Sequence, residues 1–461
     1  MAITCNNLCA QGIHQKLDVA VKHMLGDTQV RHAVVGLYVV NSKTGKPVYA
    51  LNSTMGLAPA STQKIFTSIA AFDILGSNYT YKTTVGYNGA IAQGTLTGDL
   101  IIKGSGDPSF GSWRYVHTKM DSILLQVAAA VHKAGITTIK GNIVLDETAL
   151  TYQPIPGGWI WEDIGNYYGA GVWGINWNEN QYDLTLRAGD RPGEATEIIS
   201  AEPSPEFFAM NNMIKTGAAN SGDNSTIYTS PYSADAYADG TIPAGEKHFV
   251  VSGALPYPSA TFGKELVEEL KNDTITFTGN VIWGAQLSLE KRAAPAITTT
   301  LLNYTSPPLD SLMYWFLQKS INMYGEAFAK TIALEKNGLG ETGKGVDLIR
   351  DYWQHNGIEK PSIKMQDGSG LSPQNRVTPE AEVMALQHAK TRPWFKSFYN
   401  CLPLYNGIKM KSGTIGGSKA FAGYHTAADG TEYTFSIIIN NYDGTMASIV
   451  QKMYTVLNVL K

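Results

Sequence analysis

The chain has 461 residues, of which 43% are hydrophobic and 16% charged, and its formal net charge is -3. This length exceeds one ordinary hydrophobic core and predicts two or three domains. The charge balance and the lack of a basic run disfavour a nucleic-acid partner. No apolar run reaches about 18 residues, so we expect no membrane-spanning segment.

Cysteines are few. Cys5 and Cys9 lie near the N-terminus, and Cys401 stands alone. The first two could close a small disulfide or lie in a frayed terminus, and the sequence leaves both readings open. No Cys/His set has the spacing of a zinc site, so we expect no metal. The first residues also lack the basic region of a signal peptide.

The N-terminal part begins with a predicted β-hairpin at 34–51, in which polar turn residues separate two apolar runs. Residues 61–75 then change to helical spacing, with Ile65, Ile69 and Phe72 on one face. The dipeptide Gly76-Ser77 ends this helix.

Residues 80–300 have a different sequence pattern, in which short β-like runs alternate with Gly and Pro turns. Helical patterns interrupt them at 119–134, 205–215 and 262–271. We therefore expect one or two mostly β modules here.

Helices return after residue 305, and strands close the chain. The predicted helices cover 307–319, 322–336, 342–356 and 379–390, the strands 409–413, 420–427 and 431–442, and a last helix begins near 445. An Asp429-Gly430 turn joins the last two strands. Both chain ends are therefore expected to build one sheet of an α+β domain, with the middle of the chain inserted into it.

The expected domain boundaries follow from these shifts in texture. The sheet domain takes residues 1–76 and 301–461, a second domain takes 77–182 and 253–300, and a third takes 183–252, which is rich in Ser, Ala, Asp and Gly.

The first candidate for chemistry is Ser61, three residues before Lys64. On a helix this spacing places both side chains on one face. A serine needs a base to act as a nucleophile, and a lysine with a lowered pKa can supply one. Taken alone, the pair favours the commoner case, in which the serine caps a helix and the lysine is solvated.

Two further motifs lie far along the chain. Ser320 and Asn322 fall between two predicted helices, where a turn would direct both to one side. Lys411-Ser412-Gly413-Thr414 follows on a predicted strand, where the glycine would let a substrate backbone approach. Separately, the first suits helix caps and the second a Gly-rich hairpin.

Together, the three motifs resemble the ordered Ser-x-x-Lys, Ser-x-Asn and Lys-Thr-Gly set of penicillin-binding proteins and β-lactamases. More than half of the chain separates Ser61 from Ser320, as in the class C low-molecular-mass D-alanyl-D-alanine carboxypeptidase/endopeptidases of peptidase family S13, the penicillin-binding protein 4 type. The segments LIIKGSGDPSF (100–110), WIWEDIGNYYGAGVWGINWNEN (159–180) and DGSGLSPQNRVTP (367–379) also resemble that family. Ile321 and Ser412 depart from its usual Asp and Thr.

The resemblance implies roles for the motif residues. Ser61 would attack the penultimate D-alanine of a peptidoglycan stem peptide, with Lys64 as general base. Ser320 would relay the proton to the leaving amine, and Asn322 would bind the substrate amide. Lys411 would help to lower the pKa of Lys64 and would bind the terminal carboxylate.

The strand after Lys411 is implied to bind substrate. The hydroxyls of Ser412 and Thr414 would join Lys411 at the terminal carboxylate, beside Gly413. The backbone N–H groups of Ser61 and Thr414 would form the oxyanion hole.

The same resemblance implies a second contact from the inserted module. Asp163 and Tyr168 match the acidic residue and the tyrosine that meet the amino end of a diaminopimelate side chain, and Ile415 would line that pocket. A plain surface carboxylate is an equal reading of Asp163.

These implications define the expected function, a serine carboxypeptidase or endopeptidase that β-lactams acylate and that needs no cofactor. The substrate places it in the periplasm or outside the cell, with any leader removed and peripheral membrane association left open. The alternatives are a β-lactamase or esterase on the same fold, or a non-catalytic cell-wall-binding protein.

Overall fold

The computed structural model describes residues 3–206 and 209–461, with side chains from residue 12 onward. Cys5 and Cys9 lie outside the described side chains, so their pairing stays open. The chain forms two compact units. The first unit comprises Met1–Asn78, Leu309–Ile332 and Thr342–Lys461, and the second comprises Tyr79–Pro308 and Ala333–Glu341.

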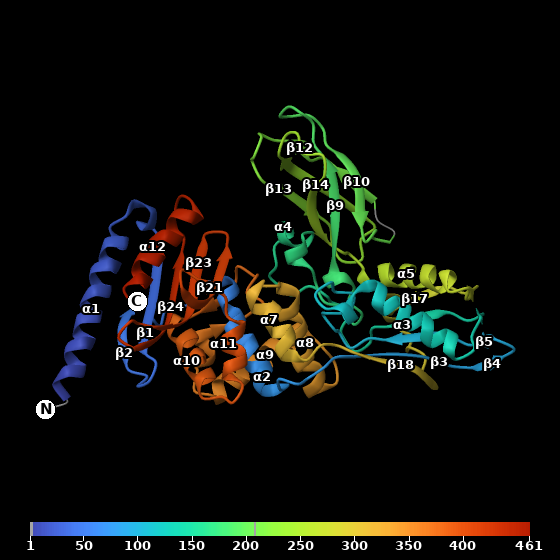
Figure 1. Ribbon diagram of the computed structural model, residues 1–461, viewed down its shortest axis with the longest axis horizontal. Helices are drawn as coiled ribbons and strands as arrows, with labels where there is room; N and C mark the ends of the chain where they lie inside the picture. The colour runs from blue at the N-terminus through green and yellow to red at the C-terminus, as the bar shows by residue number, and fades with distance from the viewer. Residues whose placement is uncertain (1–2, 207–208) are drawn as a thin grey trace. The chain divides into compact units, whose positions relative to one another are not determined.

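The first unit is built on an antiparallel six-stranded sheet (Figure 1). Its strands, in spatial order, are β2 (Pro47–Leu51), β1 (Val34–Asn41), β24 (Glu432–Asn440), β23 (Ser418–Thr426), β22 (Ile408–Ile415) and β21 (Leu404–Tyr405). Strand β1 pairs with β24 along its whole length, from Val34 opposite Asn440 to Asn41 opposite Tyr433. This pairing confirms the prediction that both chain ends share one sheet.

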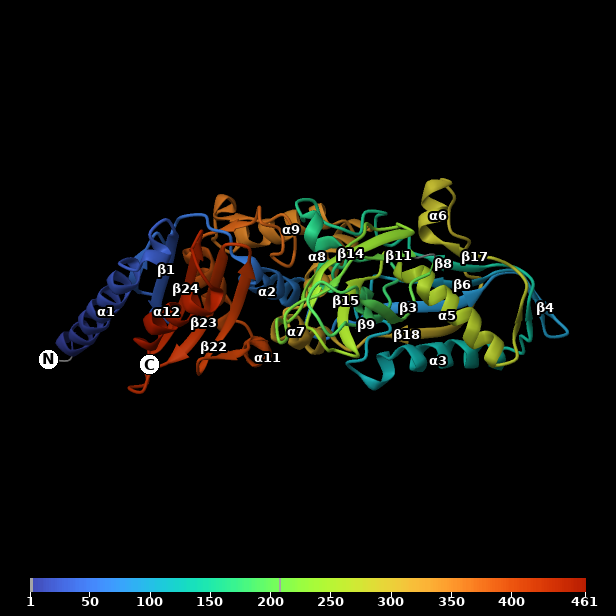
Figure 2. The same cartoon turned by 90° about the horizontal axis from the view of Figure 1, so that it is seen from above.

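Neighbouring side chains of β24 point to opposite faces of this sheet and show which helices pack on each face. Ile437 packs in the core with α1 (Ile3–Leu25) and α12 (Met446–Asn458), whereas Ser436 donates to Glu382 of α10 (Pro379–Lys390). The remaining helices of this unit are α2 (Lys64–Ile74), α7 (Leu309–Gln318), α9 (Thr342–His355), α11 (Phe395–Cys401) and the first part of α8 (Asn322–Asn337). Figure 2 shows β22, β23 and β24 lying side by side. The sequence predicted α7, α8, α9 and α10 but gave no indication of α1.

Helix α2 begins later than predicted. Ala60–Gln63 form a 3-10 turn, and the α-helix starts at Lys64. All residues from Lys64 to Phe72 are buried, so the expected amphipathic helix is instead covered on every side. A short ladder of β19 (Ile363–Lys364) and β20 (Arg376–Val377) closes the loop after α9.

The second unit contains a five-stranded mixed sheet. Its order is β17 (Val281–Trp283), β8 (Ile143–Asp146), β6 (Leu100–Lys103), β3 (Lys82–Tyr87) and β18 (Thr299–Thr305). Helices α3 (Met120–Lys133) and α5 (Pro258–Asn272) contribute Ile123, Val127, Phe262 and Leu266 to its core. A smaller sheet of β16 (Thr276–Phe277), β7 (Thr138–Ile139), β5 (Thr95–Thr97) and β4 (Ala90–Ala92) extends this core, and α4 (Trp161–Ile164) and α6 (Gly284–Leu289) are short helices.

A separate small core lies between two further sheets of this unit. Leu184, Leu186, Ile227 and Val251 are among its buried residues. One sheet contains β10 (Glu197–Glu202), β9 (Gln181–Arg187) and β15 (Phe249–Ala254), and the other contains β11 (Ala209–Asn212), β14 (Asp235–Ile242), β12 (Lys215–Thr216) and β13 (Asn224–Tyr228). The domain boundaries within the second unit stay a prediction.

The predicted helix at 205–215 is wrong. Ala209–Asn212 form β11, which pairs in parallel with β14, Met210 opposite Ala236. Exposure alternates along this strand, since Met210 packs on the small core while Ala209 and Asn211 face solvent. Tertiary pairing therefore overrides a helical pattern of low amplitude. None of the described helices combines the length and the apolar character needed to span a bilayer.

Candidate active site

The first motif places a partly exposed serine above a fully buried lysine. Ser61 lies on the 3-10 turn, after Ala60 in the left-handed backbone region (φ 49°). Lys64 is 0% exposed, and its Nζ lies 3.0 Å from Ser61 Oγ. This contact is the nucleophile-to-base distance that proton abstraction requires.

The surroundings of Lys64 favour its neutral form. Burial lowers the pKa of Lys64 to about 7, and the carboxylates of Asp367 and Glu326 oppose this shift. Its Nζ also donates to Asn322 Oδ1 at 2.6 Å and to the Ser369 carbonyl oxygen at 2.7 Å. Burial is thus the main cause of the lowered pKa of Lys64. The sequence instead predicted that the charge of Lys411 would help to lower it.

The second motif lies on the turn before α8, as predicted. Ser320 has φ 58°, a backbone region that costs energy for a residue with a side chain, and Asn322 is the first residue of α8. Because Asn322 Oδ1 accepts from Lys64 Nζ, the first two motifs meet directly. Ser320 is partly exposed and reaches the third motif.

The third motif runs along β22. Lys411 is 0% exposed, and its Nζ lies 3.0 Å from Ser320 Oγ and 2.8 Å from the Ser412 carbonyl oxygen. Burial lowers the pKa of Lys411 well below its ordinary value, and positive charge at Lys64 and Lys419 adds to the effect. Lys64 therefore contacts Ser61 and Asn322, and Lys411 contacts Ser320. The second motif, whose two polar residues are two apart in sequence, thus links the first motif to the third.

Glycine is needed at position 413 for the packing of the protein itself, whereas the sequence predicted that it lets a substrate backbone approach. A Cβ at this position would overlap the Pro59 carbonyl oxygen and lie 2.9 Å from Ser61 N. Glycine is therefore required so that β22 can pack against the turn that carries Ser61, whether or not a substrate approaches.

The outer part of β22 is open to solvent. Ser412 and Ile415 are partly exposed, and Thr414 is exposed. Lys419 stands opposite Thr414 on β23, and its Nζ donates to Thr414 Oγ1 at 2.7 Å. Sequence reasoning did not single out Lys419, nor Glu326, Asp367 and Ser369 beside Lys64.

The two remaining predicted residues lie in the second unit. Asp163 is partly buried on α4, and burial raises its pKa to about 6, with Glu162 adding to the shift. Tyr168 is exposed, and burial of part of its ring together with the charge of Asp163 raises its pKa to about 12. Asp163 and Tyr168 therefore lie near each other, whereas their predicted role in substrate binding stays a prediction.

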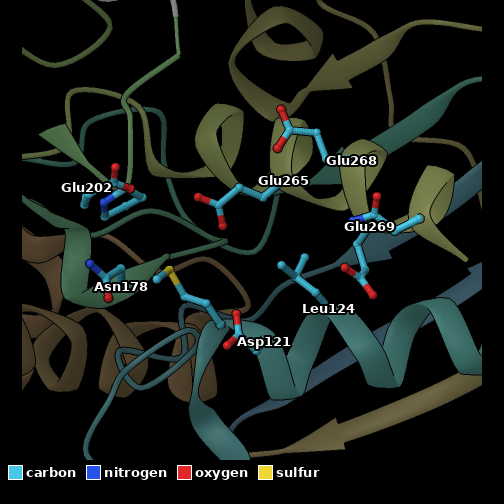
Figure 3. A pocket seen from close by; sticks show the side chains of 10 residues that line it. Asp121, Leu124, Asn178, Glu202, Glu265, Glu268 and Glu269 are labelled. Atoms are coloured by element: carbon cyan, nitrogen blue, oxygen red, sulfur yellow. The ribbon is translucent and has the colours of Figure 1, made fainter. Parts of the chain in front are cut away.

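A cavity of about 370 Å³ also lies in the second unit (Figure 3). Its carboxylates come from Asp121, Glu202, Glu265, Glu268 and Glu269. Burial raises the pKa of Glu265 to about 7, although Trp177 Nε1 donates to it at 3.0 Å. None of the residues lining the cavity belongs to the three motifs, and the described part of the chain holds no acidic, His or Cys cluster arranged for a metal ion.

The sheet with helices on both faces has the architecture of the penicillin-binding-protein/β-lactamase-like transpeptidase fold, and the Ser-Lys, Ser-Asn and Lys-Ser-Gly groups lie together in it. The model of the D-Ala-D-Ala carboxypeptidase 3 (S13) family matches residues 17–407, and the chain belongs to this family.

Individual relatives agree with this assignment. A D-alanyl-D-alanine carboxypeptidase from Actinomadura sp. (strain R39) is 26% identical over 463 residues, covering 93% of this chain and 81% of the relative. The D-alanyl-D-alanine carboxypeptidase DacB of Haemophilus influenzae is 24% identical, covering 88% of this chain and 85% of its own. The crystal structure of penicillin binding protein 4 from H. influenzae superposes with a TM-score of 0.80 at 23% identity, over 98% of this chain and 99% of the other, so the two share a fold.

Proposed function

We propose that this protein is a serine D-alanyl-D-alanine carboxypeptidase/endopeptidase that cleaves peptidoglycan stem peptides through an acyl-enzyme on Ser61. The observation that carries the proposal is the 3.0 Å contact between buried Lys64 Nζ and Ser61 Oγ, in a chain of the S13 family.

In the acylation step, neutral Lys64 takes the proton of Ser61 as Oγ attacks the carbonyl of the penultimate D-alanine. Ser320, which contacts Lys411 Nζ, gives its hydroxyl proton to the leaving amine of the terminal D-alanine and is reprotonated with the proton that Lys64 removed from Ser61. Asn322 keeps Lys64 in place through Oδ1 while its amide side chain binds the substrate amide. Water then attacks the ester and releases the shortened peptide.

Substrate binding follows β22. Lys411 and the hydroxyls of Ser412 and Thr414 bind the terminal carboxylate, and the backbone N–H groups of Ser61 and Thr414 bind the oxyanion. Each such donor typically contributes about 3–4 kcal/mol to the transition state. The solvent exposure of Thr414 and the partial exposure of Ser412 support this assignment.

Selectivity for the stem peptide is assigned to Asp163, Tyr168 and Ile415, which would bind the amino end of the side chain at the third stem position. The neighbouring positions of Asp163 and Tyr168 support this assignment. Such a substrate requires export, so we place the protein in the periplasm or outside the cell.

β-Lactams should acylate Ser61 because they present a strained amide beside a carboxylate. A crystal structure of H. influenzae penicillin binding protein 4 in complex with a β-lactam has the same fold as this chain, with a TM-score of 0.74. Fast turnover of a cephalosporin would instead indicate a β-lactamase.

The test is intact-mass measurement after incubation with benzylpenicillin, followed by mapping of the modified peptide. We expect a stable adduct of one penicillin on Ser61, and D-alanine release from a D-Ala-D-Ala peptide. Ser61→Ala should abolish both. Equal D-alanine release by Ser61→Ala would contradict the serine mechanism.

A further inference from the structure

The segment Asp367–Ser372 forms a tight turn beside Lys64, built around a buried carboxylate. Asp367 is 0% exposed. Within the turn, Oδ1 accepts from Gly370 N at 2.8 Å and Oδ2 accepts from Ser372 N at 2.6 Å. Two side chains add to this cage, since Oδ1 also accepts from Gln63 Nε2 at 2.9 Å and from Asn375 Nδ2 at 3.0 Å.

The turn is joined to the elements that carry the nucleophile and the base. Gln63 Nε2 also donates to the Asp367 carbonyl oxygen at 2.7 Å, and Thr67 of α2 donates to the Gly368 carbonyl oxygen at 2.6 Å. Gly370 has φ 87°, and a Cβ there would overlap the Ala60 carbonyl oxygen. The turn therefore packs directly against the 60–63 turn on which Ser61 lies.

The middle of the turn touches the base itself. The Ser369 carbonyl oxygen accepts from Lys64 Nζ at 2.7 Å, so Lys64 is held from three sides by Ser61, Asn322 and Ser369. Ser369 can present this oxygen only while the turn keeps its shape. The carboxylate of Asp367 ties both ends of the turn together.

We propose that Asp367 is a positioning residue for the general base: its carboxylate fixes the 367–372 turn, which directs the Ser369 carbonyl oxygen at Lys64 Nζ and keeps that amine against Ser61. The inference rests on the proposed acyl-enzyme function and deepens it. Asp367 does not touch the reacting atoms in this arrangement.

A second acid supports the turn from the other side. Glu326 of α8 is 0% exposed, and both of its carboxyl oxygens accept from Gly368 N at 3.1 Å. Burial and the charge of Asp367 raise the pKa of Glu326 to about 8. The charged groups that act on the pKa of Lys64 are therefore Asp367 in the turn and Glu326 on α8, and Lys64 in turn acts on Lys411 of β22.

Replacing Asp367 should have two separate effects on acylation, one on its maximal rate and one on its pH dependence. Loss of the carboxylate releases the Ser369 carbonyl, so the maximal acylation rate should fall. Loss of its negative charge also removes an attraction for the ammonium form of Lys64, so the acid limb of the pH–rate profile should move to lower pH. A residue that only stabilises the fold would not shift this limb.

The experiment measures benzylpenicillin acylation by intact mass from pH 5 to 9, with kcat and KM on a D-Ala-D-Ala peptide, for Asp367→Ala and Asp367→Asn. Asp429→Asn is the matched control, because Asp429 accepts from Thr431 N in an exposed turn remote in sequence from the motifs. A misplaced base typically costs about 100-fold, so we expect this fall for Asp367→Ala, mainly in kcat. Asp367→Asn keeps an acceptor and should lose less, yet shift the acid limb equally, while Asp429→Asn behaves as wild type.

The proposal is overturned if a folded Asp367 variant keeps the maximal acylation rate of the wild type. It is also overturned if the acylation rate falls without a shift of the acid limb of the pH–rate profile. Asp367→Asn, which preserves the shape of the side chain, decides the question if Asp367→Ala does not fold. A wild-type protein that benzylpenicillin fails to acylate would instead refute the proposed function, so the two failures are distinguishable.

Discussion

Lys64 combines full burial with hydrogen bonds to three acceptors. Burial penalises the charged amine, whereas the acceptors and the nearby carboxylates favour it, and the balance leaves its pKa at about 7. A lysine with this pKa exists as both acid and base near neutral pH, which suits a group that must take up and return a proton.

The pH dependence of acylation should follow from this balance. Below pH 7 the protonated fraction of Lys64 grows, so the rate of benzylpenicillin acylation should fall about tenfold per pH unit, and it should level off above pH 7. Stopped-time intact-mass measurement checks this. A rate that does not change between pH 5 and 8 would exclude Lys64 as the base.

Lys64→Arg should lose acylation by about 10²–10⁴-fold, because the guanidinium stays charged and cannot accept a proton. Lys344→Arg, on the exposed side of α9, is the matched control and should acylate normally. Comparable rates for both variants would contradict the assignment.

Gly413 and Gly416 offer a matched pair on the same hairpin. A Cβ at 413 meets the backbone of Pro59 and Ser61, whereas a Cβ at 416 meets nothing within 4 Å. Gly413→Ala should therefore lower the unfolding free energy by about 1–3 kcal/mol and lower acylation, and Gly416→Ala should change neither. Urea unfolding and penicillin labelling measure the two effects.

At the scale of elements, Asp73 near the end of α2 joins three later segments. Its carboxylate accepts from Tyr352 Oη at 2.5 Å, from Trp394 Nε1 at 2.7 Å and from Arg392 Nε at 3.0 Å, and it lies 3.3 Å from His388 Nε2. Burial raises the pKa of Asp73, but these hydrogen bonds outweigh it and leave the pKa below its ordinary value.

Asp73→Ala should remove about 1–3 kcal/mol of unfolding free energy, because it takes the shared carboxylate acceptor from several partly buried donors. Since the folded-state pKa is the lower one, this stabilisation is present above the ordinary carboxyl pKa and is lost as pH falls. Asp347→Ala, which breaks an exposed ion pair 3.6 Å long with Arg350, should cost less than about 1 kcal/mol. Equal urea midpoints for the two variants would contradict this prediction.

The sequence predicted most elements of the first unit, since hairpin turns and helical spacing are local signals. It failed for α1, although Leu17, Val21 and Met24 form a buried stripe, because the residues before them mix polar and apolar types and include Gly12, which obscures the helical period. It also placed the start of α2 at Ser61, where packing against β22 and the 367–372 turn imposes a 3-10 turn instead.

The site shows the same limit. The three motifs could be found from residue types and order, because they consist of side chains whose identity and spacing the sequence shows directly. The Ser369 carbonyl could not, since a backbone oxygen carries no sequence signal and its direction depends on the contacts of Asp367.

At the scale of the whole molecule, the two units have separate hydrophobic cores. We expect two calorimetric transitions, because distinct cores can unfold as distinct cooperative units. Benzylpenicillin should raise the transition of the first unit alone, since Ser61 belongs to it, and Ser61→Ala should abolish the shift. A single transition that shifts as a whole would contradict this expectation.

The pairing of β1 with β24 also sets an order in time during synthesis. β1 is made before the second unit, but the neighbour that fills its inner edge, Glu432–Asn440, is made after it. The second unit lies largely in one continuous stretch and can complete its core meanwhile. Until then β1 has an open hydrogen-bonding edge, and Ser61 lacks the β22 strand against which its turn packs. The reactive serine therefore acquires these surroundings only after β22, which follows the second unit in the chain, has been made.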